Sequence, residues 1–291
     1  MTKKIAPDDY NILSKFLFEQ LDSNEVLQTN HASERSQFMR LNSGKVRQIG
    51  TVSDAELSLK LFSGSSDIRT SSRSFTLTGD SNEDRARGIK VIRALQEEVK
   101  QLPIDPFASI PESSEVSESL FKGQLLEPEI AAVEIPKALH GLPVTGFYAA
   151  GDVVRASTNS LGQFHWFETE TFNFDYSLFD EEHRMAKGIY SGRTWSTDTF
   201  IENIDETNLA FEALKKPKQK IGPGQYRTYL SPMALSEIVD LFSWGFIGEG
   251  AIRRNESALR LVRSGDKSFS PKFNLSHDFS LGLAQIGRAH V

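Results

Sequence analysis

The stretch QFHWFETETFNFDY, residues 163–176, decides the fold because its side chains alternate in character with a period of two. Successive side chains of a β-strand point to opposite faces of the sheet. The pattern therefore predicts a strand with one mostly aromatic face that also carries two acids. The residues expected on that face are Phe164, Trp166, Glu168, Glu170, Phe172, Phe174 and Tyr176.

Further strands are predicted on either side of this stretch, where short runs have strand-like composition and are bounded by turn residues. The predicted strands are residues 26–35, 37–42, 45–52, 55–63 and 69–78, and the region 146–191 is strand-like in general. Between two of these strands, residues 42–45 (Asn-Ser-Gly-Lys) tolerate positive φ, so we expect a hairpin there.

Helices are predicted where apolar residues recur at intervals of three and four, at residues 9–21, 81–102 and 198–214. In the second helix, Ser81 is expected to be the N-cap, with Asp84 three residues later. Residues 103–119 are rich in proline, serine and acids, so we expect a loop. The lysine, proline and glycine segment 215–224 is expected to mark a domain boundary.

The composition limits the classes of function. The chain has 291 residues, a net charge of −6 and no cysteine, which excludes disulfides, thiolate nucleophiles and cysteine metal sites. An acidic chain without a concentrated basic face is not expected to bind nucleic acid. The first ten residues are polar and no long apolar stretch exists, so we expect a cytoplasmic protein with no membrane association.

Two carboxylates offer the first candidate chemistry. Glu168 and Glu170 lie on one face of the predicted strand, where they could hold a metal or act as an acid–base pair. A solvent-exposed end of a mostly aromatic sheet face explains the two carboxylates equally well. His165 is close in sequence but lies on the opposite face by strand parity, which argues against a joint site.

Three segments together carry a resemblance to a known family. They are GQYRTYLSPMALSEIVDLFSWG (residues 224–245), STNSLGQFHWFE (157–168) and SPKFNLSHDFSLGLA (270–284). They resemble, in turn, the step between two domains, an Asn-Ser-Xaa-Gly strand pair and a later strand in the TldD/PmbA family, once called modulators of DNA gyrase. The resemblance covers most of the chain.

Catalytic members of that family are zinc peptidases with an HExxxH helix, whose two histidines bind zinc and whose glutamate would polarise the attacking water. The matching positions here are Ser236, Glu237 and Leu241. Only the glutamate is kept, and leucine has no lone pair to offer a metal. The resemblance thus implies the fold, but no zinc site in this chain.

The same helix has an explanation without chemistry. Ser231 suits an N-cap and Pro232 suits the first helical position. Its apolar residues fall at i, i+3, i+4 and i+7 spacing, which predicts a helix packed in a core. That stripe consists of Leu235, Ile238, Val239 and Phe242.

Members without the histidines resemble the PmbA (TldE) subunit, which pairs with a zinc-bearing TldD-like subunit around a chamber for unfolded peptides. The resemblance implies that this chain is the non-zinc subunit of such a peptidase, with the zinc in its partner, although self-association is also open. Two alternatives stand beside it. One is a stand-alone hydrolase that uses Glu168 and Glu170, and the other is a non-catalytic peptide-binding protein, with His165, Glu168 and Glu170 as binding candidates.

The expected fold class is α+β. Residues 1–222 are expected to form an N-terminal domain of antiparallel sheets with flanking helices, and residues 223–285 the start of a mostly β C-terminal domain that is truncated. The last six residues, IGRAHV at 286–291, resemble the translation of a sequencing adapter. We expect them to be a non-biological tail.

Overall fold

The structure is a computed structural model that describes residues 4–243, 247–276 and 278–284. The chain divides into two compact units. The first unit is Met1–Pro217 with Leu281–Val291, and the second is Lys218–Ser280. The tail expected at residues 286–291 lies outside the described residues.

The first unit is built on a seven-stranded sheet with the order β3-β2-β1-β5-β6-β4, and β7 also pairs with β6. Neighbouring strands are antiparallel except β4, which runs parallel to the first part of β6. The strands are β1 (Glu25–Asn42), β2 (Lys45–Ser63), β3 (Arg69–Thr76), β4 (Val116–Phe121), β5 (Val144–Asn159), β6 (Phe164–Phe179) and β7 (Met185–Gly192).

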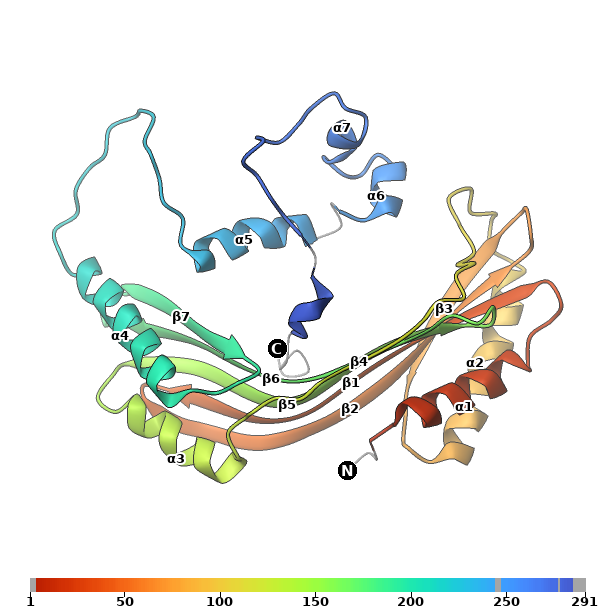
Figure 1. The fold of residues 1–291 in the computed structure, drawn as a ribbon, viewed down its shortest axis with the longest axis horizontal. Coiled ribbons are helices and arrows are strands. Elements are labelled where there is room, and N and C mark those ends of the chain that lie inside the picture. Colours follow the sequence, from red (N-terminus) through yellow and green to blue (C-terminus); the bar gives the residue numbers. More distant parts are fainter. Residues whose placement is uncertain (1–3, 244–246, 277, 285–291) are drawn as a thin grey trace. The chain divides into compact units, whose positions relative to one another are not determined.

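Four helices pack on one face of this sheet, which we call the helix face, and the opposite face is the open face. The helices are α1 (Pro7–Phe18), α2 (Ser81–Val99), α3 (Pro128–Ala138) and α4 (Thr197–Leu214). In Figure 1, α1, α2 and α3 lie along the convex side of the curved sheet. The α+β class with flanking helices is therefore confirmed for this unit.

Two hydrophobic cores lie on the helix face. The first core joins α3 and α4 to the second half of β6, and it contains the fully buried Phe172, Phe174 and Tyr176. The second core joins α1 and α2 to β2 and to Trp166. Because all four aromatic residues have even numbers, the alternation predicted for residues 163–176 is confirmed.

The first two strands are longer than predicted. Four separate strands were expected between residues 26 and 63, but β1 and β2 pair almost continuously, with a register shift only at Arg40/Leu41. Polar residues such as Ser36 and Ser53 interrupt the side-chain pattern without interrupting the backbone ladder, since main-chain groups make its hydrogen bonds. The hairpin is confirmed, because Ser43 and Gly44 both have positive φ, 51° and 69°.

The helix ends and the loop also differ from expectation. Asp80, not Ser81, caps α2, because its carboxylate accepts from the backbone N–H groups of Asn82 and Glu83. The Asp84 carboxylate instead accepts from the N–H groups of Thr78 and Gly79. The loop expected at 103–119 runs into β4, and α3 was not predicted at all.

The second unit contains α5 (Pro232–Ser243), α6 (Glu249–Arg253), α7 (Arg260–Arg263) and the start of the 3₁₀ turn η1 (Phe279–Leu281). The Ser231 hydroxyl accepts from the Ala234 N–H at 3.3 Å, as expected for a cap. The prediction of a core helix is wrong, since Leu235 and Ile238 are 45% and 44% exposed. Among this unit's described residues only Ser257 is buried, and none forms a strand.

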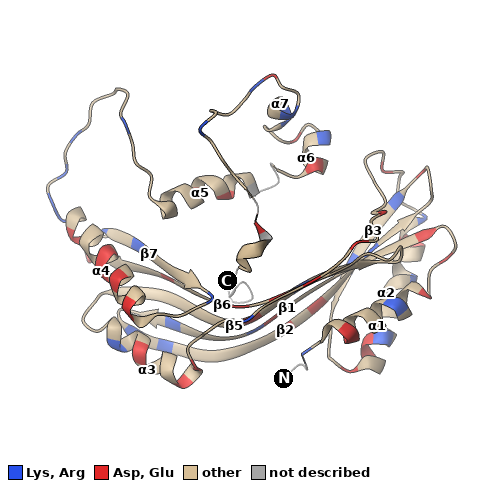
Figure 2. Ribbon diagram, viewed as in Figure 1, with Lys and Arg blue, Asp and Glu red and all other residues tan. Residues whose placement is uncertain are grey.

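Residues of both charge signs occur in both units, and acids recur along α4 (Figure 2). The basic run at residues 215–220 follows α4 directly. No helix among the described residues combines the length and apolar character needed to cross a membrane.

Candidate functional site

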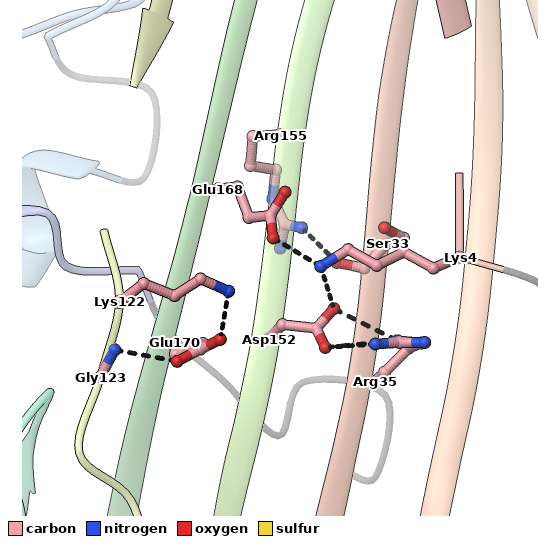
Figure 3. Close-up of polar contacts among 9 residues, drawn as sticks. All are labelled: Lys4, Ser33, Arg35, Lys122, Gly123, Asp152, Arg155, Glu168 and Glu170. Atoms are coloured by element: carbon pink, nitrogen blue, oxygen red, sulfur yellow. Dashed lines mark hydrogen bonds and ion pairs between the residues drawn. The ribbon is translucent and has the colours of Figure 1, made fainter. Parts of the chain in front are cut away.

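A band of charged side chains crosses the helix face between the two hydrophobic cores. We call it the polar belt, and its members are Lys4, Arg35, Lys122, Asp152, Glu168 and Glu170 (Figure 3). Strand pairing builds it. Asp152 on β5 lies opposite Arg35 on β1 and opposite Glu170 on β6. Glu168 lies two residues before Glu170, so it points to the same face.

Two cations neutralise the inner part of the polar belt. The Lys4 ammonium group donates to the Glu168 carboxylate and lies 3.9 Å from the Asp152 Oδ2 atom. The Arg35 guanidinium donates to Asp152 Oδ1 through Nε at 3.2 Å and Nη2 at 3.0 Å. The Glu168 side chain is 8% exposed and that of Asp152 is 14% exposed, so water screens these pairs only partly.

Glu170 sits at the outer end of the polar belt, in the gap between β4 and β7. Its carboxylate accepts from the Lys122 ammonium at 2.8 Å and from the Gly123 N–H at 3.0 Å. Burial raises the pKa of Glu170, but these hydrogen bonds to the ionised form outweigh it and hold the pKa below its usual value. The same contact raises the pKa of Lys122.

This arrangement limits what the carboxylates can do chemically. Each of the three acids has a cation within 4 Å. A carboxylic acid that donates a proton near neutral pH needs a raised pKa, and the pKa of Glu170 is shifted the other way. Within the described residues, no group of three or more His, Asp or Glu side chains is placed to hold a metal ion. The belt is therefore best suited to holding strands and terminal segments together.

The other predicted residues lie elsewhere. His165 lies on the open face, away from Glu168 and Glu170, and its Nδ1 atom is 2.7 Å from the Ser117 hydroxyl. Ser236 and Glu237 are exposed on α5, and the Ser236 hydroxyl donates to the Met233 carbonyl at 2.7 Å. Leu241 on the same helix is 62% exposed.

Four members of the polar belt were not singled out from the sequence: Lys4, Arg35, Lys122 and Asp152. Their neighbours in the chain give no motif, since the contacts of the belt span from 48 to 164 residues in sequence. The register of β1, β5 and β6 places Arg35 and Asp152 beside the two glutamates, while Lys4 comes from the segment before α1 and Lys122 directly follows β4. The one available signal was parity, which places Glu168 and Glu170 together.

No protein-family model matches the chain, and no curated protein matches it. Solved structures do. A proposed modulator of DNA gyrase from Thermotoga maritima has a TM-score of 0.62 and 15% identity, over 86% of this chain and 58% of its own. A second proposed modulator of DNA gyrase, from Bacteroides thetaiotaomicron, has a TM-score of 0.61 and 15% identity, over 88% of this chain and 61% of its own. TldE from Thermococcus kodakarensis has a TM-score of 0.55 and 15% identity, over 87% of this chain and 58% of its own.

These likenesses show the fold. The chain has the fold of these proposed modulators of DNA gyrase and of TldE, as the sequence resemblance predicted. It spans between 58% and 61% of the length of those structures.

Proposed function

We propose that this chain is a TldD/PmbA-like protein that acts as the non-zinc subunit of a peptidase complex for unfolded peptides. The observation that carries the proposal is the fold shared with TldE. The chain's own residues support the assignment to the non-zinc subunit, because Ser236 and Leu241 stand where the resemblance places the two histidines.

The proposed partner is a TldD-like subunit that holds the zinc, or else a second copy of this chain. In the hetero-complex, the partner's zinc supplies a polarised water, and this chain closes the chamber and orients the peptide. We also propose a cytoplasmic location and a domain boundary at residues 222/223. No contact to nucleic acid is part of the proposal.

A stand-alone hydrolase built on Glu168 and Glu170 is less well supported. Both carboxylates are in ion pairs, with Lys4 and Lys122 respectively. An acid–base pair needs two groups whose pKa values are pushed apart, and here the pKa of Glu170 is lowered beside a cation. A non-catalytic peptide-binding protein remains an outcome of the test below.

The test mixes the full-length protein with a TldD-like zinc subunit and a disordered peptide, with a folded protein as control substrate. We expect no cleavage by this chain alone, increased cleavage when the partner is added, and complete loss with a zinc chelator. Elemental analysis of this chain alone is expected to give no stoichiometric zinc. About one tightly held zinc per chain would contradict the proposal.

Two matched variants separate the alternatives. Glu237→Gln is expected to leave cleavage by the pair unchanged, because the zinc belongs to the partner. Glu170→Gln removes a carboxylate at nearly constant shape. If this chain cleaves alone and Glu170→Gln abolishes that cleavage, the hydrolase alternative replaces the subunit proposal.

A further inference from the structure

The open face of the sheet holds a short segment of the chain itself. After the second unit, residues Leu281–Ala284 return to the first unit and lie against β4, β5 and β6. The surface beneath them includes one row across three strands, formed by Val153, Thr169 and Phe121. Val153 and Thr169 are fully buried.

Three contacts hold this segment. The Thr169 hydroxyl donates to the carbonyl oxygen of Gly282 at 2.6 Å. A Cβ atom at Gly282 would come within 2.4 Å of the Phe121 ring, and its φ of +61° also favours glycine. Ala284 packs against the cluster of the buried Ala149 and Val153, against which Phe147 also packs.

The side chains that flank the glycine take little part. Leu281 is 58% exposed and Leu283 is 55% exposed, although both are large and apolar. The surface thus contacts a backbone carbonyl, a residue without a side chain and a small methyl group. Recognition of this kind requires a glycine and a small residue but leaves the flanking side chains free, so many different unfolded peptides with this pattern satisfy it.

We propose that this part of the open face is a peptide-binding site, and that Leu281–Ala284 is its intramolecular occupant. The inference rests on the proposed function and deepens it. The ligand class is an unfolded peptide with a glycine opposite Phe121 and a small residue two positions later. The carbonyl oxygen of that glycine accepts a hydrogen bond from the Thr169 hydroxyl. The chain's own segment competes with such a peptide and so reduces its binding until the segment is displaced.

The test measures binding of a fluorescent hexapeptide, Phe-Ser-Leu-Gly-Leu-Ala, to the full-length protein by anisotropy. Gly282→Val in the protein should expel the resident segment, because valine meets the Phe121 ring. If the segment occupies the site about nine-tenths of the time, its removal strengthens the apparent affinity about tenfold. The matched control is Gly265→Val, at a glycine with φ of +84° and no atom within 4 Å.

Two further arms test the contacts themselves. In the Gly282→Val background, Thr169→Val should weaken peptide binding about three- to tenfold, as expected for one lost hydrogen bond. Thr169→Ser, which keeps the hydroxyl, should restore it. A peptide with valine in place of glycine, Phe-Ser-Leu-Val-Leu-Ala, should bind at least about tenfold more weakly, because its side chain would have to displace the Phe121 ring.

A variant-free arm keeps the proposal falsifiable if Gly282→Val fails to fold. Excess Phe-Ser-Leu-Gly-Leu-Ala added to the unaltered protein should accelerate amide hydrogen exchange of residues 281–284. No acceleration, no gain of affinity in a folded Gly282→Val protein, or equal binding of the valine peptide would overturn the inference.

The outcome is distinguishable from failure of the proposed function. If Gly282→Val binds no peptide but still raises cleavage by the zinc subunit, the subunit proposal stands and the open-face site is wrong. If Gly282→Val binds the glycine peptide but has no effect on the zinc subunit, the site stands and the subunit proposal is wrong.

Discussion

Helices α2 and α5 have the same kind of apolar stripe and opposite burial. On α2, Ile92 and Leu95 are fully buried. On α5, Leu235 and Ile238 are 45% and 44% exposed. Helical periodicity thus identifies the face that is able to pack, but it does not show what covers that face.

The difference comes from the neighbours of each helix. In the first unit, α2 packs against α1, β2 and β3 and closes the second core. In the second unit, none of the described apolar residues is buried, and no strand forms among them. Most of a helix's stability in a protein comes from packing of its apolar face, so α5 gains little from its own unit.

The sharpest way to break this comparison is the same truncation in both helices. Ile92→Ala should lower the free energy of unfolding by about 2–5 kcal/mol, because it leaves a cavity in a closed core. Ile238→Ala should change it by less than about 0.5 kcal/mol, as is usual for exposed positions. Denaturant titration of both variants provides the measurement.

A large decrease in the free energy of unfolding for Ile238→Ala would contradict this comparison. It would mean that the stripe of α5 is covered in solution. The same experiment in the presence of the proposed zinc subunit would then show whether the cover comes from the partner.

A second comparison uses a glycine in each unit. A methyl group added at Gly88 of α2 would lie 2.5 Å from a Leu17 side-chain carbon, and Leu17 is fully buried. Overpacking of about 1–3 kcal/mol should outweigh the gain of about 1 kcal/mol in helix propensity, so Gly88→Ala should destabilise the protein.

Gly250→Ala in α6 should have the opposite sign. The nearest atom to the new methyl group is the end of the Arg254 side chain at 3.2 Å, which is exposed and able to shift. Helix propensity then dominates, and stability should rise by up to about 1 kcal/mol. Thermal and denaturant unfolding of the two variants provides the measurement. If the second unit were packed as tightly as the first, both substitutions would lower the stability.

The sequence predicted what depends on local pattern. The alternation over residues 163–176 places Trp166, Phe172, Phe174 and Tyr176 on one face, and the structure buries all four there. The Ser43-Gly44 turn follows from backbone chemistry alone. Both signals act within a few residues and need no partner.

What the sequence could not supply is pairing between distant segments. In the polar belt, Arg35 meets Asp152 through a strand register, and Lys4 meets Glu168 from the segment before α1, and no local pattern encodes either contact. The prediction that α5 is buried was wrong for the same reason, since a surface that covers a helix comes from segments distant in the sequence. Helix α3 was missed because Pro136 lies inside it, where proline normally argues against a helix.

A third prediction concerns pH, because only a closed core can keep a titratable group neutral. His31 is 1% exposed and lies beside the rings of Tyr10 and Trp166, with its ring centroid 5.7 and 6.1 Å from theirs. Burial lowers the pKa of His31 in spite of its contact with the Glu56 carbonyl. Below its ordinary pKa of 6.5, the unfolded chain therefore binds a proton that the folded protein does not.

Stability should consequently fall as the pH falls below about 6.5, by at most about 1.4 kcal/mol per pH unit from this group. His31→Phe keeps an aromatic ring but cannot be protonated, so its stability should lose this part of the pH dependence. The exposed His140 provides the control, because His140→Phe makes the same substitution and leaves His31 in place. Identical pH profiles for His31→Phe and the unaltered protein would refute the account.

The smallest expected effect concerns ion pairs in the two units. In the polar belt, the Asp152 side chain is 14% exposed and faces both Arg35 and Lys4. In the second unit, the Glu249 carboxylate pairs with Arg253 but is 43% exposed. Asp152→Asn removes a charge without changing shape, and it leaves Arg35 without its carboxylate. Because Arg35 is itself 43% exposed, water replaces part of the lost interaction, and we expect the free energy of unfolding to fall by about 0.5–1 kcal/mol.

The matched control, Glu249→Gln, should give no measurable change in the free energy of unfolding. Both effects should be compared at low and high salt, since a partly buried pair is screened less than an exposed one. If Asp152→Asn is as silent as Glu249→Gln at low salt, the polar belt contributes nothing to the stability of the sheet, and its charges must be retained for another reason.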